Sequence, residues 1–251
     1  MTTGDLTHLV RTAHGDAWEV EGRLRTPYGG GAARVRGARL MASGIKQPKW
    51  NNADATASDV DLEALTAWYS ARDLPWGMRV PLELTVELGT PLFVKRCAGL
   101  LLEAFPGSAN QLGDVRVRRC EPGFATAYAG LDASVFGSDL AESQAWVYPQ
   151  FDAPGFRHWI AEVGGMPVGI ATTVRSNGEA GPAAYLCGLG ALPGSPPEAL
   201  DCLVAVAIGD AFDAGADLVH ANPDDDASMQ RLAALGAIEV PGFLVRVVIG
   251  A

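Results

Sequence analysis

The fold of this chain is decided by the stretch Tyr185–Leu203, which reads Tyr-Leu-Cys-Gly-Leu-Gly-Ala-Leu-Pro-Gly-Ser-Pro-Pro-Glu-Ala-Leu-Asp-Cys-Leu. Residues 185–192 form a short apolar run that stops at a proline, and this pattern predicts a buried strand. Beyond a loop rich in Gly and Pro, apolar residues recur at helical spacing, which predicts a helix. The apolar positions of this helix are Leu200, Leu203, Val204, Ala207, Ile208, Ala211 and Phe212.

The segments on either side of this stretch also alternate between strands and helices. Residues 157–163 and 166–174 are apolar runs joined by Gly164-Gly165, which predicts a hairpin with a tight turn. The remaining predicted elements are, in chain order, a strand at 114–120, helices between 121 and about 148, a strand at 217–222, a helix at 226–235 and a strand at 238–249.

This order of elements resembles the GNAT superfamily of N-acetyltransferases over roughly residues 114–250. Three motifs carry the resemblance: Glu-Val-Gly-Gly-Met-Pro-Val-Gly at 162–169, Gly-Leu-Gly-Ala-Leu-Pro at 188–193 and Arg-Leu-Ala-Ala-Leu-Gly-Ala at 231–237. The resemblance implies an α/β (α+β) fold in which a mixed, mostly antiparallel sheet is flanked by helices. It also implies an enzyme, an N-acyltransferase that uses acyl-CoA.

The first half of the chain repeats the later part of this pattern. Residues 35–43 predict a strand, 58–72 a helix, 75–80 a strand and 97–102 a closing strand. We therefore predict a protein of tandem type, with a shortened, degenerate GNAT-like unit at 1–110 and a GNAT-like acyltransferase domain at 111–251. The cluster of turn formers at 106–110 is the predicted linker. The alternative is that two generic alternating segments align by chance.

Two of the predicted helices, the one at 58–72 and the one that follows Ser195, begin with the pattern of a capping box. Ser58 precedes Asp61 by three residues, and Ser195 precedes Glu198 by the same spacing. In such a box the serine accepts the amide of the acidic residue, whose carboxylate reaches back to the serine amide. The sequence therefore predicts helices that begin just after Ser58 and Ser195.

Composition and charge narrow the classes of function. The net charge is -10, and the imbalance lies in residues 120–251, which hold 4 Arg against 16 acidic residues. This balance argues against a nucleic-acid surface and favours a cationic amine as substrate over a polyphosphate. The alternative is ordinary charge that maintains solubility. The predicted partner is thus a small-molecule amine, with neither nucleic acid nor membrane, and both a monomer and a homodimer remain open.

Localisation is predicted from what the sequence does not contain. The apolar runs are shorter than the roughly 18 residues that a membrane span needs, and the first residues lack a basic segment followed by an apolar one. Cys97, Cys120, Cys187 and Cys202 show no CxxC spacing, which predicts reduced thiols and neither a zinc site nor a disulfide framework. We expect a cytoplasmic protein without a metal.

The resemblance implies that acetyl-CoA, or another acyl-CoA, binds along the strand and at the start of the helix that follows. Gly188 and Gly190 would permit a β-bulge that exposes backbone groups to this ligand. However, Pro196 and Pro197 have no amide hydrogen, and the predicted capping box occupies further donors. The sequence therefore predicts a weakened pyrophosphate site. The predicted cofactor-binding residues are Leu189, Gly190, Ala191, Leu192, Ser195, Glu198, Ala199, Leu200 and Asn222.

The catalytic groups are less clearly marked. Strand alternation places His220 on one face with Asn222, where its imidazole could take a proton from an ammonium group. Glu162 is the second candidate base, and for both residues a structural role is the alternative. The family's tyrosine acid is missing, since Leu232 occupies its position. We predict direct attack of the amine on the thioester; the alternative is a non-catalytic, GNAT-derived module that binds a ligand or serves as a scaffold.

Overall fold

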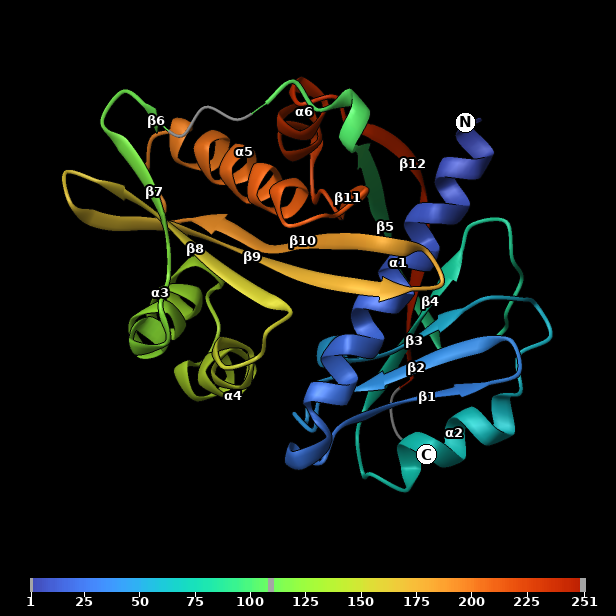
Figure 1. The fold of residues 1–251 in the computed structure, drawn as a ribbon. Coiled ribbons are helices and arrows are strands. Elements are labelled where there is room, and N and C mark those ends of the chain that lie inside the picture. The colour runs from blue at the N-terminus through green and yellow to red at the C-terminus, as the bar shows by residue number, and fades with distance from the viewer. Residues whose placement is uncertain (1, 108–110, 249–251) are drawn as a thin grey trace. The chain divides into compact units, whose positions relative to one another are not determined.

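The computed structural model describes residues 2–107 and 111–248, drawn in Figure 1. Its sheet strands are mostly antiparallel and are flanked by helices, as the predicted α/β class requires. The chain divides into two compact units, one made of Met1–Cys97 with Val240–Ala251 and the other of Ala98–Glu239. This division differs from the predicted ranges 1–110 and 111–251, because the chain passes between the units within two long strands. Of the predicted linker, residues 108–110 lie outside the described residues.

The first unit begins with a helix that the sequence analysis did not predict. Helix α1 (Thr3–Leu24) starts at a capping box, in which Thr2 accepts the amide of Asp5 and the Asp5 carboxylate accepts the amide of Thr2. Its apolar pattern is interrupted because charged residues, including Asp16 and Glu19, are buried on the face that packs on the sheet. A search for an apolar stripe therefore misses this helix.

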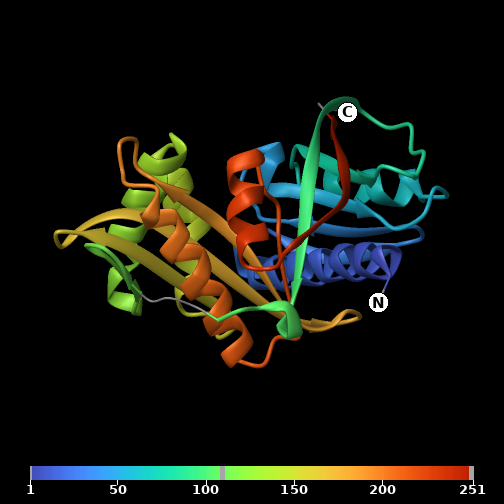
Figure 2. The ribbon, with the colours of Figure 1, turned by 90° about the horizontal axis from the view of Figure 1, so that it is seen from above.

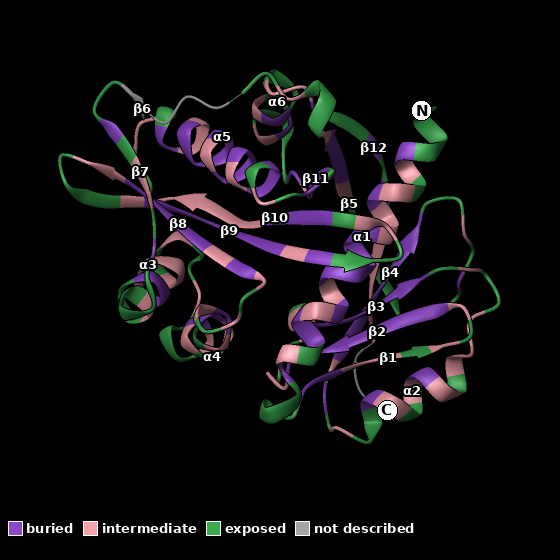
Figure 3. Cartoon of the chain, viewed as in Figure 1, coloured by how far each residue is buried: buried purple, intermediate pink, exposed green. Residues whose placement is uncertain are grey.

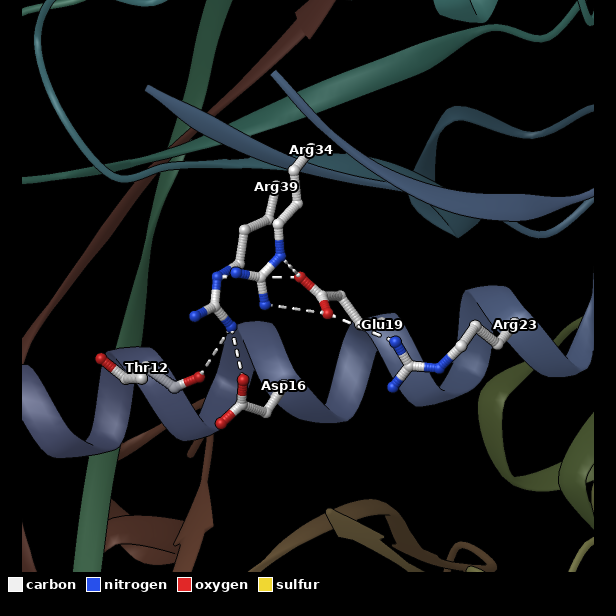
Figure 4. Close-up of polar contacts among 6 residues, drawn as sticks. All are labelled: Thr12, Asp16, Glu19, Arg23, Arg34 and Arg39. Atoms are coloured by element: carbon white, nitrogen blue, oxygen red, sulfur yellow. Dashed lines mark hydrogen bonds and ion pairs between the residues drawn. The ribbon is translucent and has the colours of Figure 1, made fainter. Parts of the chain in front are cut away.

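The buried charges of α1 are paired with arginines on the first two strands, β1 (Gly31–Val35) and β2 (Ala38–Ala42), as Figure 4 shows. The Arg39 guanidinium donates to Asp16 at 2.6 Å, and Arg34 donates to Glu19 at 2.6 Å. Because each buried carboxylate has a cationic partner, the charged face of α1 can pack on the sheet.

The sheet of the first unit has the strand order β1-β2-β3-β4-β12. Strands β3 and β4 are parallel, and the other pairs are antiparallel. Gly37, in the left-handed region at φ +73°, turns the predicted strand 35–43 into the β1–β2 hairpin. The further elements are β3 (Asn51–Ala55), α2 (Leu62–Ser70), β4 (Trp76–Pro81), the first part of β5 (Thr90–Leu101) and most of β12 (Ile238–Val248).

The capping box predicted at Ser58 is wrong. Helix α2 begins at Leu62, and Asp61 is its N-cap, with the carboxylate accepting the Ala64 amide at 3.0 Å. An aspartate at this position caps a helix as well as a serine does, so the later acceptor defines the start. Helix α2 lies over a core in which Tyr69 stacks on Trp76 with ring centroids 4.7 Å apart.

The second unit contains the predicted order of strand, helices, hairpin, strand, helix, strand and helix. Its strands have the order β5-β11-β10-β9-β8-β7-β6, with β10 and β11 parallel and the other pairs antiparallel. The elements are β6 (Gln111–Leu112), β7 (Val115–Arg119), α3 (Ala125–Phe136), α4 (Leu140–Phe151), β8 (Phe156–Val163), β9 (Met166–Gly178), β10 (Gly181–Ala191), α5 (Glu198–Asp213), β11 (Leu218–Ala221) and α6 (Asp226–Ala234).

Helices cover both faces of this second sheet. Helix α5 packs on β7, β8, β9 and β10, and Figure 2 shows it lying across the strands. Helices α3 and α4 pack on the opposite face, over Ile160 and Ile170. Figure 3 shows the middle of these strands buried, whereas much of the outer side of α3 and α4 is exposed. The sheet is therefore the middle layer of the second unit.

Short 3₁₀ helices link several of these elements: η1 (Thr26–Tyr28), η2 (Pro48–Trp50), η3 (Leu102–Ala104) and η4 (Pro122–Phe124). In the described ranges, none of the helices is both long and apolar enough to cross a membrane. All four cysteines carry free thiols.

Candidate functional site

The central feature of the second unit is the point where β10 and β11 separate. Their parallel pairing runs from Ala183 and Leu218 to Leu186 and Ala221, where β11 ends. Strand β10 continues to Ala191 with β9 on its other side. Residues 187–191 therefore have one strand edge that no paired strand covers within the described parts of the chain.

A β-bulge lies in this uncovered segment. Cys187 pairs with Thr172 and Gly190 with Ile170, so that Gly188 and Leu189 both face Ala171 on β9. Gly188 has φ +54°, in the left-handed region that glycine adopts without steric cost. The bulge that the glycines predict is thus present.

The bulge is followed by backbone groups that face the uncovered edge. The Leu192 amide donates to the Val168 carbonyl at 2.8 Å, toward β9. Because successive residues of a strand point in opposite directions, the amide and carbonyl of Ala191 face away from β9. The predicted residues Leu189–Leu192 are all half-buried, and the Ala191 backbone groups are directed to the side where β11 has ended.

The loop between β10 and α5 differs from its prediction. Ser195 does not cap the helix, because its amide donates to Leu192 and its hydroxyl donates to the Val168 carbonyl at 3.3 Å. Helix α5 begins at Glu198, and its N-cap is Pro197, with φ -57° and ψ -29° and without a side-chain cap. The proline ring already holds the backbone in a helical conformation, so the helix starts without a capping box.

The amides at the start of α5 are partly occupied. The amides of Ala199 and Leu200 donate to the carbonyls of Pro196 and Pro197 at 3.0 and 3.1 Å. The two prolines have no amide hydrogen. In the described ranges, the amides of two loop residues have no partner within the protein: Gly194 and Glu198. The loop thus offers two free donors where an uncapped helix would offer four.

His220 and Asn222 lie together at the end of β11. The His220 ring is buried, with an exposed fraction of 2 %, and stacks on Tyr185 of β10 at 4.9 Å with an angle of 9° between the rings. The Tyr185 hydroxyl donates to Asn222 Oδ1 at 2.8 Å. The position of Tyr185 beside His220 depends on the parallel register of two strands, so no local sequence pattern predicts it.

Glu162 lies elsewhere. Strands β10 and β9 separate its strand β8 from β11, which corresponds to about 14 Å at the usual spacing of strands. Its carboxylate accepts from Arg118 Nε at 2.8 Å, and the Arg118 guanidinium lies over the Phe124 ring at 4.2 Å. The structure therefore does not bring the two candidate bases into one site.

Helix α6 provides no tyrosine as an acid, and Ser228 carries its one hydroxyl. It contains no tyrosine, and Leu232, which occupies the family's tyrosine position, is buried in the core. The Ser228 amide donates to Asp225, the N-cap of this helix. Arg231 pairs with Asp201 of α5 at 2.9 Å, which joins the two helices.

A second polar cluster, which the sequence analysis missed, lies under the bulge on the side of α3 and α4. His158 Nδ1 lies 3.0 Å from Thr172 Oγ1, which lies 2.8 Å from the Tyr128 hydroxyl. Burial lowers the pKa of His158 to about 3, so this imidazole is neutral at pH 7, and burial raises the pKa of Tyr128. Tyr128 falls within the helices predicted between 121 and about 148, and only the tertiary fold brings it to Thr172.

Known structures share this architecture. No protein-family model and no curated protein match the sequence. The fold is that of the GCN5-related N-acetyltransferases, as the resemblance predicts. A GCN5-related N-acetyltransferase from Kribbella flavida is similar with a TM-score of 0.67 and 15% identity, over 94% of this chain and 96% of its own.

Two further structures also match nearly whole chains. A GCN5-related N-acetyltransferase from Sphaerobacter thermophilus has a TM-score of 0.58 and 11% identity, over 98% of this chain and 92% of its own. A conserved protein of unknown function from Staphylococcus epidermidis has a TM-score of 0.63 and 12% identity, over 87% and 93%. The similarity thus extends over both units of the chain.

Proposed function

We propose that this chain is an N-acyltransferase that uses an acyl-CoA, with acetyl-CoA as the default donor. The observation that carries the proposal is the bulged, uncovered segment of β10 at residues 187–191. A strand whose amides and carbonyls lack a neighbouring strand can align an extended ligand that carries amides of its own. The pantetheine arm of an acyl-CoA is such a ligand.

The residues that would hold this donor follow from the positions of free backbone groups. The amide and carbonyl of Ala191 would align the pantetheine arm, and the amides of Gly194 and Glu198 would meet the pyrophosphate. When bound, acyl-CoA supplies an activated thioester for transfer to an amine. With two free loop amides and the Glu198 carboxylate at the positive end of α5, we infer weak binding of the pyrophosphate.

We propose a small cationic amine as the acceptor, because residues 120–251 carry an excess of 12 negative charges over positive ones, counted as 16 acidic residues against 4 Arg. Of the two candidate bases, we favour His220, which lies on β11 where the strands separate. Glu162 is less suited because its carboxylate is paired with Arg118. The amine would attack the thioester directly, without a covalent intermediate on the protein.

Calorimetric titration tests the proposal. We expect acetyl-CoA and desulfo-CoA to bind with dissociation constants between micromolar and millimolar, and a mixture of acetyl-CoA with an amine to release free CoA thiol. Absence of both heat and a thermal shift at millimolar acetyl-CoA would contradict the proposal.

A second candidate is a non-catalytic module that binds a ligand or acts as a scaffold. It is favoured by the missing tyrosine on α6 and by the two prolines at the start of α5. Binding of acetyl-CoA without release of thiol in the presence of a broad panel of amines would support this second function over the first.

A further inference from the structure

The polar cluster under the bulge forms a continuous chain of hydrogen bonds. The Tyr128 hydroxyl lies within hydrogen-bond distance of two acceptors, the Ala171 carbonyl at 2.9 Å and Thr172 Oγ1 at 2.8 Å. Thr172 Oγ1 also lies 3.0 Å from His158 Nδ1, so the threonine hydroxyl can donate to one of its two neighbours and accept from the other. The chain runs from His158 through Thr172 and Tyr128 to the backbone of β9.

This chain is shielded from water and held by two helices. The side chains of His158, Thr172 and Tyr128 are all buried. Tyr128 comes from α3, and His158 stacks on Phe151 of α4 at 4.1 Å with an angle of 9° between the rings. Because no solvent replaces a broken link, a buried donor left without its acceptor costs more than an exposed one.

The chain ends at the residues on which the bulge is built. Ala171, whose carbonyl accepts the last hydrogen bond, is the residue that faces Gly188 and Leu189. Thr172 pairs with Cys187, the last residue before the bulge, and a Cβ placed on Gly188 would lie 3.5 Å from Thr172 Oγ1. The hydroxyl of Thr172 thus lies directly beneath the left-handed glycine.

We propose that Tyr128, Thr172 and His158 are positioning residues that fix the β-bulge of β10 and the backbone donors that follow it. The inference that this bulge serves acyl-CoA rests on the function proposed above. The low basicity of His158 fits this role, since a neutral imidazole holds one tautomer throughout the range of pH in which the protein would work.

Two variants and two matched controls test the proposal. T172V replaces the hydroxyl with a methyl group of similar size and breaks both bonds of Thr172, and Y128F removes the bonds of the Tyr128 hydroxyl to Ala171 and Thr172. T172S keeps a hydroxyl at the same position and serves as the conservative rescue. S134A removes a hydroxyl from the exposed face of the same helix α3, where Ser134 bonds to the Gly130 carbonyl.

The first measurement is amide hydrogen exchange. In T172V and Y128F we expect residues 188–192 to exchange about tenfold faster than in the wild-type protein, as for the loss of one buried hydrogen bond. T172S and S134A should exchange there at nearly the wild-type rate, and amides of β7 should not change in any variant. Equal exchange at 188–192 in wild type, T172V and Y128F would overturn the proposal, as would a uniform increase over the whole sheet.

The second measurement is acetyl-CoA binding and turnover. We expect a dissociation constant about tenfold larger in T172V, recovered in T172S, with KM rising and kcat falling less. A loss of kcat without a change in affinity would overturn a positioning role. If the wild-type protein binds no acetyl-CoA, the proposed function fails, whereas the exchange comparison still decides whether the chain holds the bulge.

Discussion

His158 lies against Phe151 and Tyr128 with an exposed fraction of 2 %, and burial lowers its pKa from 6.5 to about 3. The unfolded chain therefore binds a proton at this residue between pH 6.5 and 3, whereas the folded chain does not. The free energy of unfolding is greatest above pH 6.5 and falls as the pH decreases, by up to about 1.4 kcal/mol per pH unit.

We predict that H158N removes this dependence, because asparagine has an amide group near the place of Nδ1, which can donate or accept, and does not titrate. Urea unfolding of both proteins at pH 7 and pH 4 measures the difference. The wild-type protein should lose more free energy of unfolding than H158N between these values. Carboxylates contribute equally to both proteins, so the difference between the two losses reports on His158. Equal losses would show that the imidazole is protonated in the folded state.

Single residues show where sequence patterns mislead. Ser195 and Glu198 match the spacing of a capping box, yet the conformation of Pro197 starts α5 and the serine hydroxyl bonds to β9. The glycine at position 188 was a reliable signal, because a bulge needs a residue in the left-handed region. Backbone preferences of Gly and Pro are local, whereas the partner of a hydroxyl depends on the fold.

The start of α5 combines a positive helix end with a negative side chain. Glu198 is its first residue and is exposed, and its carboxylate lies at the positive end of the helix. We predict that E198Q binds acetyl-CoA about twofold to fivefold more tightly, because it removes repulsion of the pyrophosphate at this helix end. Calorimetric titration measures the change.

The matched control for E198Q is D213N, which makes the same change of charge at the other end of α5, where Asp213 is exposed. Its affinity for acetyl-CoA should equal that of the wild-type protein. P197G, which restores an amide donor, should also tighten binding. Unchanged affinity in both E198Q and P197G would show that the phosphates bind elsewhere on the protein.

Elements of the second unit were predicted well because their apolar patterns are strong and their turns contain Gly. The hairpin of β8 and β9, and the succession of β10, α5 and β11, all lie close to their predicted ranges. Helix α1 was missed because Asp16, Glu19 and Glu21 interrupt its buried face. Glu21 pairs with Arg25 four residues later, but Asp16 and Glu19 pair with Arg39 and Arg34 on the following strands, which no local pattern reveals.

At the scale of the molecule, each sheet is completed by a strand from a distant part of the sequence. Residues 98–101 of β5 pair with β11 in the second unit, and residues 243–248 of β12 pair with β4 in the first unit. Leu100 of β5 is buried in the core beneath α5. A domain cut at the predicted boundary of 111 would lose the β5 strand.

We therefore predict that a fragment of residues 98–251 is more stable than a fragment of residues 111–251. Burial of Leu100 alone contributes about 2 kcal/mol, which corresponds to roughly 5 °C in Tm. Thermal unfolding followed by circular dichroism, with sedimentation to detect aggregation, compares the two. Equal Tm values would show that β11 does not need this neighbour.

The sequence predicts two units. It does not predict that β5 pairs with β11, or that β12 pairs with β4, across long distances in the chain. The residues of β5 and β12 are apolar enough to predict strands, but a strand's apolar pattern does not identify the strand beside it. The tandem interpretation, with a degenerate N-terminal unit, stays a prediction that the shared parallel arrangement of β3 with β4 and of β10 with β11 supports.

The late position of β12 affects the order in which this protein can fold during translation. Strand β4 is synthesised early, yet its antiparallel neighbour at residues 243–248 leaves the ribosome only after the whole of the second unit has been made. Domains usually fold one after another as they emerge. Here the first unit must wait with an open sheet edge, which makes the nascent chain a natural client for chaperones that shield such edges.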